Sequence, residues 1–271
     1  MSDGGRFPTY FLPHGGGPCF FMDPPPGGPG TWDRMADFLR SIPTDLVETP
    51  RAILIVTGHW ETEGLAVTAG AHPALIFDYY GFPESTYRLT YPAPGAPELA
   101  AQVAAMLSAA GFPTREDPER GFDHGMFIPL KVAFPEAAIP VVELSVRRDL
   151  DPAAHIEIGR ALAPLRDEGI LILATGMSYH NLRGFFTTDP RAGAASEAFD
   201  AWLTKAVCQD SAAREAALIG WEGAPAARAC HPQEEHLIPL MVAAGAAGAD
   251  AATHAYADVV LGKRLSGFRF G

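Results

Sequence analysis

Three uninterrupted runs of apolar residues most constrain the fold of this chain of 271 residues. They are 52–57 (AILIVT), 139–146 (IPVVELSV) and 169–175 (GILILAT). Apolar runs without polar alternation are typical of strands that are buried on both faces, as in parallel sheets covered by helices. Because 48% of the residues are hydrophobic and 19% are charged, the chain can also bury a sizeable core.

Stretches of helical period lie between and after these runs. Residues 97–110 and 152–167 are rich in Ala and Leu; each begins with a proline that suits a first helical turn, and a glycine follows each closely. Two more helices are expected at 191–207 and 235–246. The alternation of strand and helix predicts an α/β fold: a single domain with a largely parallel central sheet flanked by helices. We expect residues 1–271 to form one catalytic domain.

Charge and cysteine content narrow the class of protein. The formal net charge of −12 argues against a nucleic-acid or anionic-membrane surface, since both reward clustered Lys and Arg. We see no signal-peptide pattern and no apolar run of about 18–20 residues, so we expect a cytoplasmic protein without a membrane helix. The three cysteines have no CxxC spacing and are expected to be reduced thiols: Cys19, Cys208 and Cys230.

Histidines follow three of the expected strands. His14 comes after YFLP and before three glycines, His59 directly after AILIVT, and His180 shortly after GILILAT. In open α/β sheets ligands bind outside the carboxyl ends of the strands, so we expect these imidazoles at one edge of the sheet.

A fourth histidine, His236, stands at the start of an expected helix, next to Glu234 and Glu235. Several imidazoles with a carboxylate within reach are the ligand set of a transition metal, and two histidines with one carboxylate suit oxygen-activating Fe(II). The HExxH, Walker A, GxGxxG and GxSxG motifs are all missing from the sequence, which leaves no competing signature.

The other histidines are weaker candidates. His124, in a glycine-flanked loop beside Asp123, is either an acid–base residue or a loop histidine satisfied by backbone. His72 precedes an aromatic loop and is a candidate for a pocket mouth. Two more are interpreted as structural, one in a helix and one near a C-terminal strand: His155 and His254. His231 is either a helix-entry residue, which we favour, or a weak member of the site.

Six segments occur in a specific order: PHGGGP, TGHWE, HPALIFDYYGFPESTYRLTYPAPG, GFDHGMFIPL, ATGMSYHNL and HPQEEHLIPL. Together they resemble the class III extradiol ring-cleavage dioxygenases of the LigB-type superfamily, and within it the 4,5-DOPA dioxygenase extradiol branch. The similarity runs from about residue 8 to residue 265. One departure is the proline-rich insert after PHGGGP, which bears on the substrate more than on the metal.

The resemblance implies a LigB-like single-domain α/β fold and a mononuclear non-haem Fe(II) site, with zinc seen in some members. It implies His14 and His59 as metal ligands. The HPQEEHLIPL segment supplies the third ligand, for which we expect His236, with Glu235 as the alternative.

The resemblance also implies the chemistry: a catechol-type substrate and O2 react to give a semialdehyde. His180 matches an acid–base histidine that becomes a fourth ligand when zinc is bound, and His124 matches a histidine that steadies substrate or oxygen. Four aromatic residues are candidates to wall in the ring, although packing under a long loop is an equal alternative: Phe77, Tyr79, Tyr80 and Phe82. Four arginines are candidates to bind a substrate carboxylate: Arg88, Arg147, Arg148 and Arg183.

Two other functions remain open at this stage. A zinc-dependent hydrolase or amidase could use the same histidines, because zinc lowers the pKa of bound water to about 7. A non-enzymatic binding protein of the same fold would have a filled or degraded metal site. Consumption of O2 separates the first alternative from the dioxygenase. The protein is expected to be a monomer or a homodimer.

Overall fold

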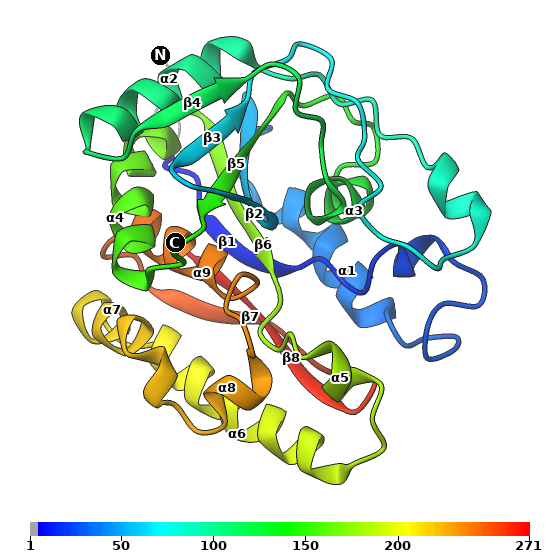
Figure 1. The fold of residues 1–271 in the computed structure, drawn as a ribbon. Helices are drawn as coiled ribbons and strands as arrows, with labels where there is room; N and C mark the ends of the chain where they lie inside the picture. The colour runs from blue at the N-terminus through cyan, green and yellow to red at the C-terminus, as the bar shows by residue number, and fades with distance from the viewer. Residues whose placement is uncertain (1–4) are drawn as a thin grey trace.

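The three apolar runs form central strands of one sheet in the computed structural model, which describes residues 5–271 (Figure 1). The strands of the described residues are β1 (Thr9–Pro13), β2 (Ala52–Thr62), β3 (Leu65–Thr68), β4 (Thr114–Asp117), β5 (Val141–Arg147), β6 (Ile170–Gly176), β7 (Ala252–Val260) and β8 (Lys263–Phe270). They lie in the order β4-β3-β5-β2-β6-β1-β8-β7.

The sheet is mixed, with a parallel centre. Strands β5, β2, β6 and β1 run parallel, whereas β3 is antiparallel to β5 and β8 is antiparallel to β1. The two-residue connections β2–β3 and β7–β8 are too short for a crossover and can only reverse the chain. The prediction of a largely parallel sheet therefore holds for the central strands. Strands β3, β4 and β8 run opposite to them, and the edge strand β7 runs in the same direction as they do.

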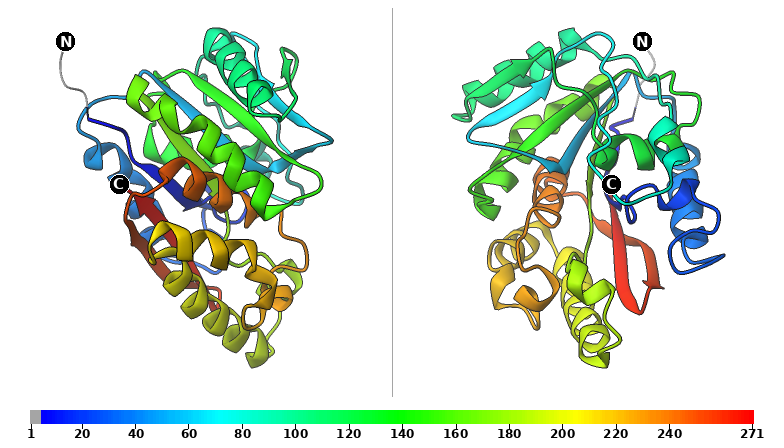
Figure 2. Two further views of the ribbon diagram at one scale, coloured as in Figure 1. Left: turned by 90° about the vertical axis from the view of Figure 1, so that its left-hand side faces the viewer. Right: turned by 45° about the vertical axis from the view of Figure 1, so that its right-hand side comes forward.

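Helices cover both faces of the sheet (Figure 2). They are α1 (Asp33–Ser41), α2 (Pro97–Ala109), α3 (His124–Ala133), α4 (Pro152–Leu162), α5 (Leu182–Phe185), α6 (Pro190–Val207), α7 (Ser211–Ile219), α8 (Ala227–Cys230) and α9 (Ile238–Ala247). The predicted helices correspond to α2, α4, α6 and α9, whereas α1, α3, α5, α7 and α8 were not predicted. None of the helices in residues 5–271 has the length and apolar character needed to cross a membrane.

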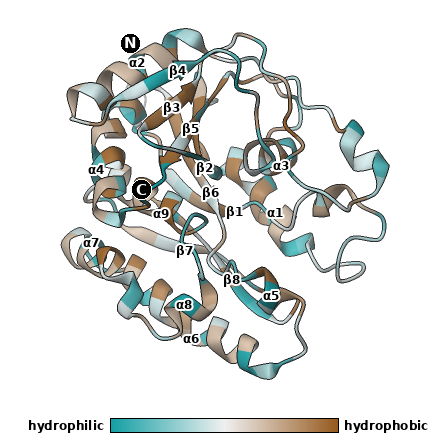
Figure 3. Cartoon of the chain, in the orientation of Figure 1, coloured by the Kyte–Doolittle hydropathy of each residue, from teal (hydrophilic) through white to brown (hydrophobic). Residues whose placement is uncertain are grey.

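Strand β2 shows why a continuous apolar run is needed. Ile53 and Ile55 belong to the core cluster that includes α1 and α3, whereas Leu54 and Val56 belong to the cluster that includes α2, α4 and α9. Successive side chains of a strand point to opposite faces, so both must be apolar when both faces are covered. Figure 3 shows the resulting hydrophobic colour along the central strands.

Two glycines let the segment before α9 cross the strand ends. A Cβ atom on Gly58 of β2 would lie 2.4 Å from the Glu235 carbonyl oxygen, and one on Gly176 of β6 would lie 2.1 Å from that of His236. The Met177 N–H also donates to the His236 carbonyl at 3.0 Å. His236 thus lies two residues before α9 rather than opening it, and it is held against β2 and β6.

Candidate metal centre

Three of the predicted ligands meet at the carboxyl ends of the parallel strands. His14 directly follows β1, and its N–H donates to the Gly176 carbonyl of β6. His59 lies inside β2 rather than after it, because the strand continues through a change of register between Val56 and Glu61. The Nε2 atom of His59 lies 3.3 Å from that of His14 and 3.2 Å from that of His236. A bulge of this kind redirects side chains at the end of a strand.

These three imidazoles are neutral at physiological pH. Burial lowers the pKa of His14 and His236 well below the usual range, and neighbouring histidines lower it further. Burial and the nearby His124 lower the pKa of His59 to about 4, against the opposing effect of Asp123 and Asp78. A metal needs deprotonated nitrogen donors, so the environment supplies the required state.

The tautomers direct Nε2 lone pairs at one another. The Nδ1 atom of His59 lies 3.4 Å from Asp78 Oδ2, and the Nδ1 atom of His236 lies 2.8 Å from Glu235 Oε1. Each Nδ1 therefore carries the proton, and the Nε2 atoms are unprotonated acceptors that face each other without a donor between them. That arrangement is unfavourable unless a cation lies between the nitrogens.

The spacing fits such a cation. Two ligands at bonds of about 2.1 Å lie about 3.0 Å apart at 90° and about 3.4 Å apart at the tetrahedral angle. The observed separations of 3.2 and 3.3 Å fall between these values. The rings of His14, His59 and His236 are inclined to each other by 59° to 89°, so their planes can converge on one point.

His124 lies on one side of this cluster and is the first residue of α3, not a loop residue. Its Nδ1 atom lies 2.7 Å from Asp78 Oδ1, and the same oxygen accepts the His124 backbone N–H at 3.0 Å. Burial by itself would raise the pKa of Asp78, but the hydrogen bonds and charge of His124 lower it to about 2. Asp78 is therefore a carboxylate at the N-terminus of α3, where the helix dipole also favours negative charge.

His180 lies on the other side, four residues after β6. Its Nδ1 atom lies 2.9 Å from Glu235 Oε1, the oxygen that also accepts from His236. The rings of His180 and His236 are stacked at 3.4 Å with an angle of 18° between them. His180, Glu235 and His236 thus form one cluster, next to the cluster of His14, His59 and His124.

A buried network supports the bulge in β2. The Thr57 hydroxyl donates to Asp123 Oδ1 and accepts the His59 N–H, each at 3.2 Å. A Cβ atom on Gly125 would lie 2.3 Å from the Thr57 hydroxyl, so glycine lets α3 approach β2 this closely. The Asp123 N–H also donates to the buried Glu143. Burial raises the pKa of Glu143, and the negative charge of Asp123 raises it further. The carboxylate that bonds the His124 side chain is therefore Asp78, whereas the Asp123 carboxylate accepts from Thr57 of β2.

The four aromatic residues predicted to enclose the substrate ring differ in position: three pack together near His124, and one is exposed. The Tyr79 ring meets His124 edge-on at 5.5 Å, and Phe77 packs on Tyr79 at 6.0 Å. Phe82 packs on Tyr79 at 5.5 Å. Tyr80 is 91% exposed, so its interpretation as a wall of the site is wrong in this structure.

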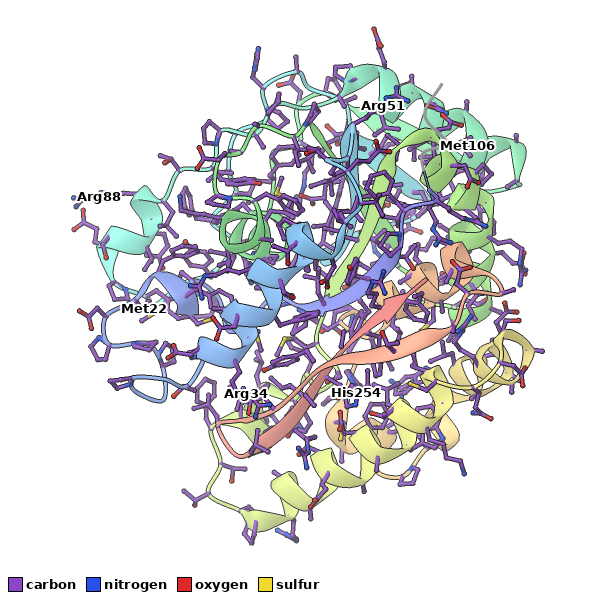
Figure 4. The ribbon with its side chains drawn as sticks, turned by 180° about the vertical axis from the view of Figure 1, so that it is seen from behind. Met22, Arg34, Arg51, Arg88, Met106 and His254 are labelled. Carbon is purple, nitrogen blue, oxygen red and sulfur yellow. The ribbon has the colours of Figure 1, made fainter. Side chains whose placement is uncertain are left out.

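Three of the four candidate arginines are already paired. Arg88, Arg147 and Arg148 bond Glu84, Asp149 and Glu63 respectively. Arg88 points outward at the periphery of the molecule (Figure 4). Arg183, in α5, is exposed and has no carboxylate partner among residues 5–271.

The sequence comparison now decides the family. Residues 8–263 match the family described as the catalytic LigB subunit of aromatic ring-opening dioxygenase. The chain belongs to the LigB family. It is therefore an enzyme of the aromatic ring-opening dioxygenase class, as the sequence resemblance predicted.

Individual relatives agree with the LigB assignment. The chain is 38% identical to the dioxygenase TasH of Hapsidospora irregularis, over 98% of this chain and 86% of the relative. It is 41% identical to the 4,5-DOPA dioxygenase extradiol of Beta vulgaris, over 73% of this chain and 74% of the relative, and 38% identical to that of Escherichia coli, over 73% of each. The crystal structure of an uncharacterized protein from Escherichia coli K12 superposes with a TM-score of 0.76 at 29% identity, over 98% of this chain and all of that one.

The structure separates the remaining histidines from the LigB site. His155 is buried, accepts the Arg147 N–H at Nε2 and lies 2.7 Å from the Asp151 carbonyl at Nδ1. His231 follows α8 rather than entering a helix, and it is buried with its Nε2 atom 3.0 Å from the Ser178 carbonyl. His254 bonds Ser266 in the β7–β8 hairpin, and His72 is exposed.

Asp78 is the residue of this site that the sequence analysis did not single out. Its signal was present in the segment IFDYYGFP, where one carboxylate stands among aromatic residues. Its position 46 residues before His124 gave no indication that the two side chains meet.

Proposed function

We propose that this single catalytic domain cleaves a catechol-type ring next to its two hydroxyl groups, using a mononuclear metal and O2. The observation that carries the proposal is a set of three neutral imidazoles, two buried and one half-buried, whose Nε2 atoms face one another at 3.2 and 3.3 Å. Two further histidines adjoin this set: His124 groups with His14 and His59, and His180 groups with His236. Membership of the LigB family supports the reaction class.

His14, His59 and His236 are the proposed metal ligands. Glu235 is the weaker candidate for the third position, because its Oε1 atom lies on the Nδ1 side of His236, away from His59. When bound, Fe(II) supplies the electron path between the aromatic ring and O2 that this chemistry requires. Zinc fits the same nitrogen donors and is the alternative metal in isolated protein.

His180 and His124 are the proposed catalytic residues. Glu235 occupies the Nδ1 atom of His180, which leaves Nε2 free to take a proton from a catechol hydroxyl. Asp78 occupies the Nδ1 atom of His124 in the same way, so its Nε2 atom can hydrogen-bond the substrate or oxygen. Tyr79, packed on His124, is the proposed wall of the ring pocket.

The net reaction needs no further reagent. The carbon–carbon bond beside the diol breaks, and both oxygen atoms of O2 enter the product, which is a semialdehyde. Relatives named 4,5-DOPA dioxygenase extradiol make catechols with an amino-acid side chain the first substrates to try.

The test is oxygen uptake by protein loaded anaerobically with Fe(II), with absorbance recorded in parallel. The panel contains DOPA, caffeate, protocatechuate and unsubstituted catechol. Stoichiometric O2 consumption with a yellow product is the expected result. No uptake with any catechol, in protein that holds one metal per chain, would contradict ring cleavage and favour a zinc hydrolase.

A further inference from the structure

Two carboxylates contact the histidine cluster in matching ways. Asp78 lies between His59 and His124, with Nδ1–oxygen distances of 3.4 and 2.7 Å. Glu235 lies between His236 and His180, with distances of 2.8 and 2.9 Å. Each carboxylate therefore joins one proposed metal ligand to one proposed catalytic histidine.

We propose that Asp78 and Glu235 are paired positioning residues, each of which holds the Nδ1 atoms of one metal ligand and one catalytic histidine. This inference rests on the proposed function. By fixing both Nδ1 protons, each carboxylate directs the Nε2 atom of the ligand to the metal position and frees the Nε2 atom of the catalytic histidine for substrate. Carboxylates behind ligating histidines fix their tautomer and raise their basicity.

The contacts of these side chains support positioning rather than a general structural role. The hydrogen bonds and ion pairs of both side chains, within residues 5–271, go to the histidine cluster alone. Neither carboxylate pairs with an arginine or lysine there, unlike the neighbouring Glu234, which bonds Arg228. Both side chains are mostly shielded, with 24% of Asp78 and 15% of Glu235 exposed.

A second metal held by Glu235 is a poorer explanation of the same distances. An imidazole binds a metal in the plane of its ring. The rings of His180 and His236 are nearly parallel and 3.4 Å apart, so one ion cannot lie in both planes. A carboxylate oxygen accepts over a broad range of directions, so Glu235 Oε1 can accept from His236 and also pair with His180.

The two carboxylates differ in how they use their oxygens. Asp78 uses both: Oδ1 accepts from the Nδ1 and backbone N–H of His124, and Oδ2 faces His59. Glu235 uses Oε1 for both histidines, and its Oε2 atom is buried without a hydrogen-bond partner.

This difference makes amide substitutions informative. In Asp78→Asn the oxygen must stay with His124, because a backbone N–H cannot change its role, so the new NH2 group faces His59. A donor then replaces the acceptor behind a metal ligand. In Glu235→Gln the NH2 group takes the place of the unpartnered Oε2 atom, and Oε1 keeps its hydrogen bond with His236 and its contact with His180. Both variants lose one negative charge, but only the first replaces an acceptor behind a metal ligand by a donor.

The experiment measures zinc affinity of the metal-free protein by competition with a chromophoric chelator. We expect Asp78→Asn and Glu235→Ala to bind zinc about 10- to 100-fold more weakly than the wild type, the usual effect of losing such a partner. Glu235→Gln should stay within about threefold, because its acceptor remains. Glu234→Gln is the matched control for charge loss one residue away and should be unchanged.

A second measurement uses the Fe(II)-saturated variants with the catechol that the wild type turns over fastest. Glu235→Ala should lower kcat at least tenfold with little change in KM, because His180 loses its orienting partner. Urea unfolding of each metal-free variant identifies any that fails to fold. If Asp78→Asn fails to fold, the comparison of Glu235→Ala with Glu235→Gln still tests the positioning role.

The outcomes separate the two proposals. Zinc affinities of Asp78→Asn and Glu235→Ala within threefold of the wild type would overturn the positioning role. A wild-type protein that binds neither zinc nor Fe(II) would instead overturn the proposed metal site itself.

Discussion

Replacing Gly58 by alanine is expected to move His236 away from the other proposed metal ligands. The backbone of Gly58 is outside the positive-φ region, so alanine itself is not strained there. Its Cβ atom would lie 2.4 Å from the Glu235 carbonyl oxygen, whereas ordinary contacts begin at 3.4 Å. The HPQEEH segment must therefore move away from β2 by about 3.4 − 2.4 = 1.0 Å.

A shift of this size is large compared with metal–ligand distances. The Nε2 atoms of His59 and His236 are 3.2 Å apart, and a movement of about 1 Å along that line brings them to about 4.2 Å. Two bonds of about 2.1 Å reach that far only if the N–metal–N angle is linear. We therefore expect zinc affinity to fall at least about 100-fold, and backbone overpacking to lower the free energy of unfolding by about 1–3 kcal/mol.

The assay pairs chelator competition for zinc with urea unfolding of the metal-free protein. Gly223→Ala is the control, because a Cβ atom there meets nothing within 4 Å. Gly176→Ala tests the same idea from β6, since its Cβ atom would lie 2.1 Å from the His236 carbonyl oxygen. Wild-type affinity and stability in Gly58→Ala would refute the reasoning, since the segment would then not depend on its close approach to β2.

Three further predictions concern single histidines. His14→Ala or His59→Ala should abolish metal content, measured by elemental analysis, and full occupancy in either variant would remove that residue from the ligand set. His180→Gln should lower kcat by about 10²- to 10⁴-fold while iron content stays near one per chain; unchanged turnover would end its acid–base role. Burial lowers the pKa of His155 from 6.5 to about 4, so the unfolded chain binds more protons between these values and stability falls as pH drops from about 6.5 to 4. His155 changes the free energy of unfolding by about 3 kcal/mol at most over this pH range. His155→Gln should therefore reduce the pH dependence of the unfolding free energy measured in urea. An unchanged pH dependence would contradict a buried neutral imidazole.

Local sequence pattern was sufficient for the centre of the fold. The run AILIVT is typical of a strand covered on both sides, because it is a continuous apolar run rich in β-branched residues, and it forms the first part of β2. The strands that flank this centre were less predictable, since β3 and β8 take their direction from two-residue connections rather than from their own side chains. Helix α3 was missed because its residues are nearly all buried, which leaves no amphipathic period to detect.

The same contrast applies to the site. The sequence by itself determined which imidazoles follow the parallel strands, since the order of strand and histidine along the chain fixes the edge at which His14, His59 and His180 emerge. Only the tertiary structure decided which carboxylates serve them. The segment of Glu235 depends on close backbone contacts at Gly58 and Gly176, and the loop of Asp78 depends on one at Gly121, where a Cβ atom would lie 2.3 Å from the Ala74 carbonyl oxygen. Such contacts leave no periodic signal in the sequence. The chain encodes the metal-binding nitrogens locally, but their tautomers and directions arise from packing between distant segments.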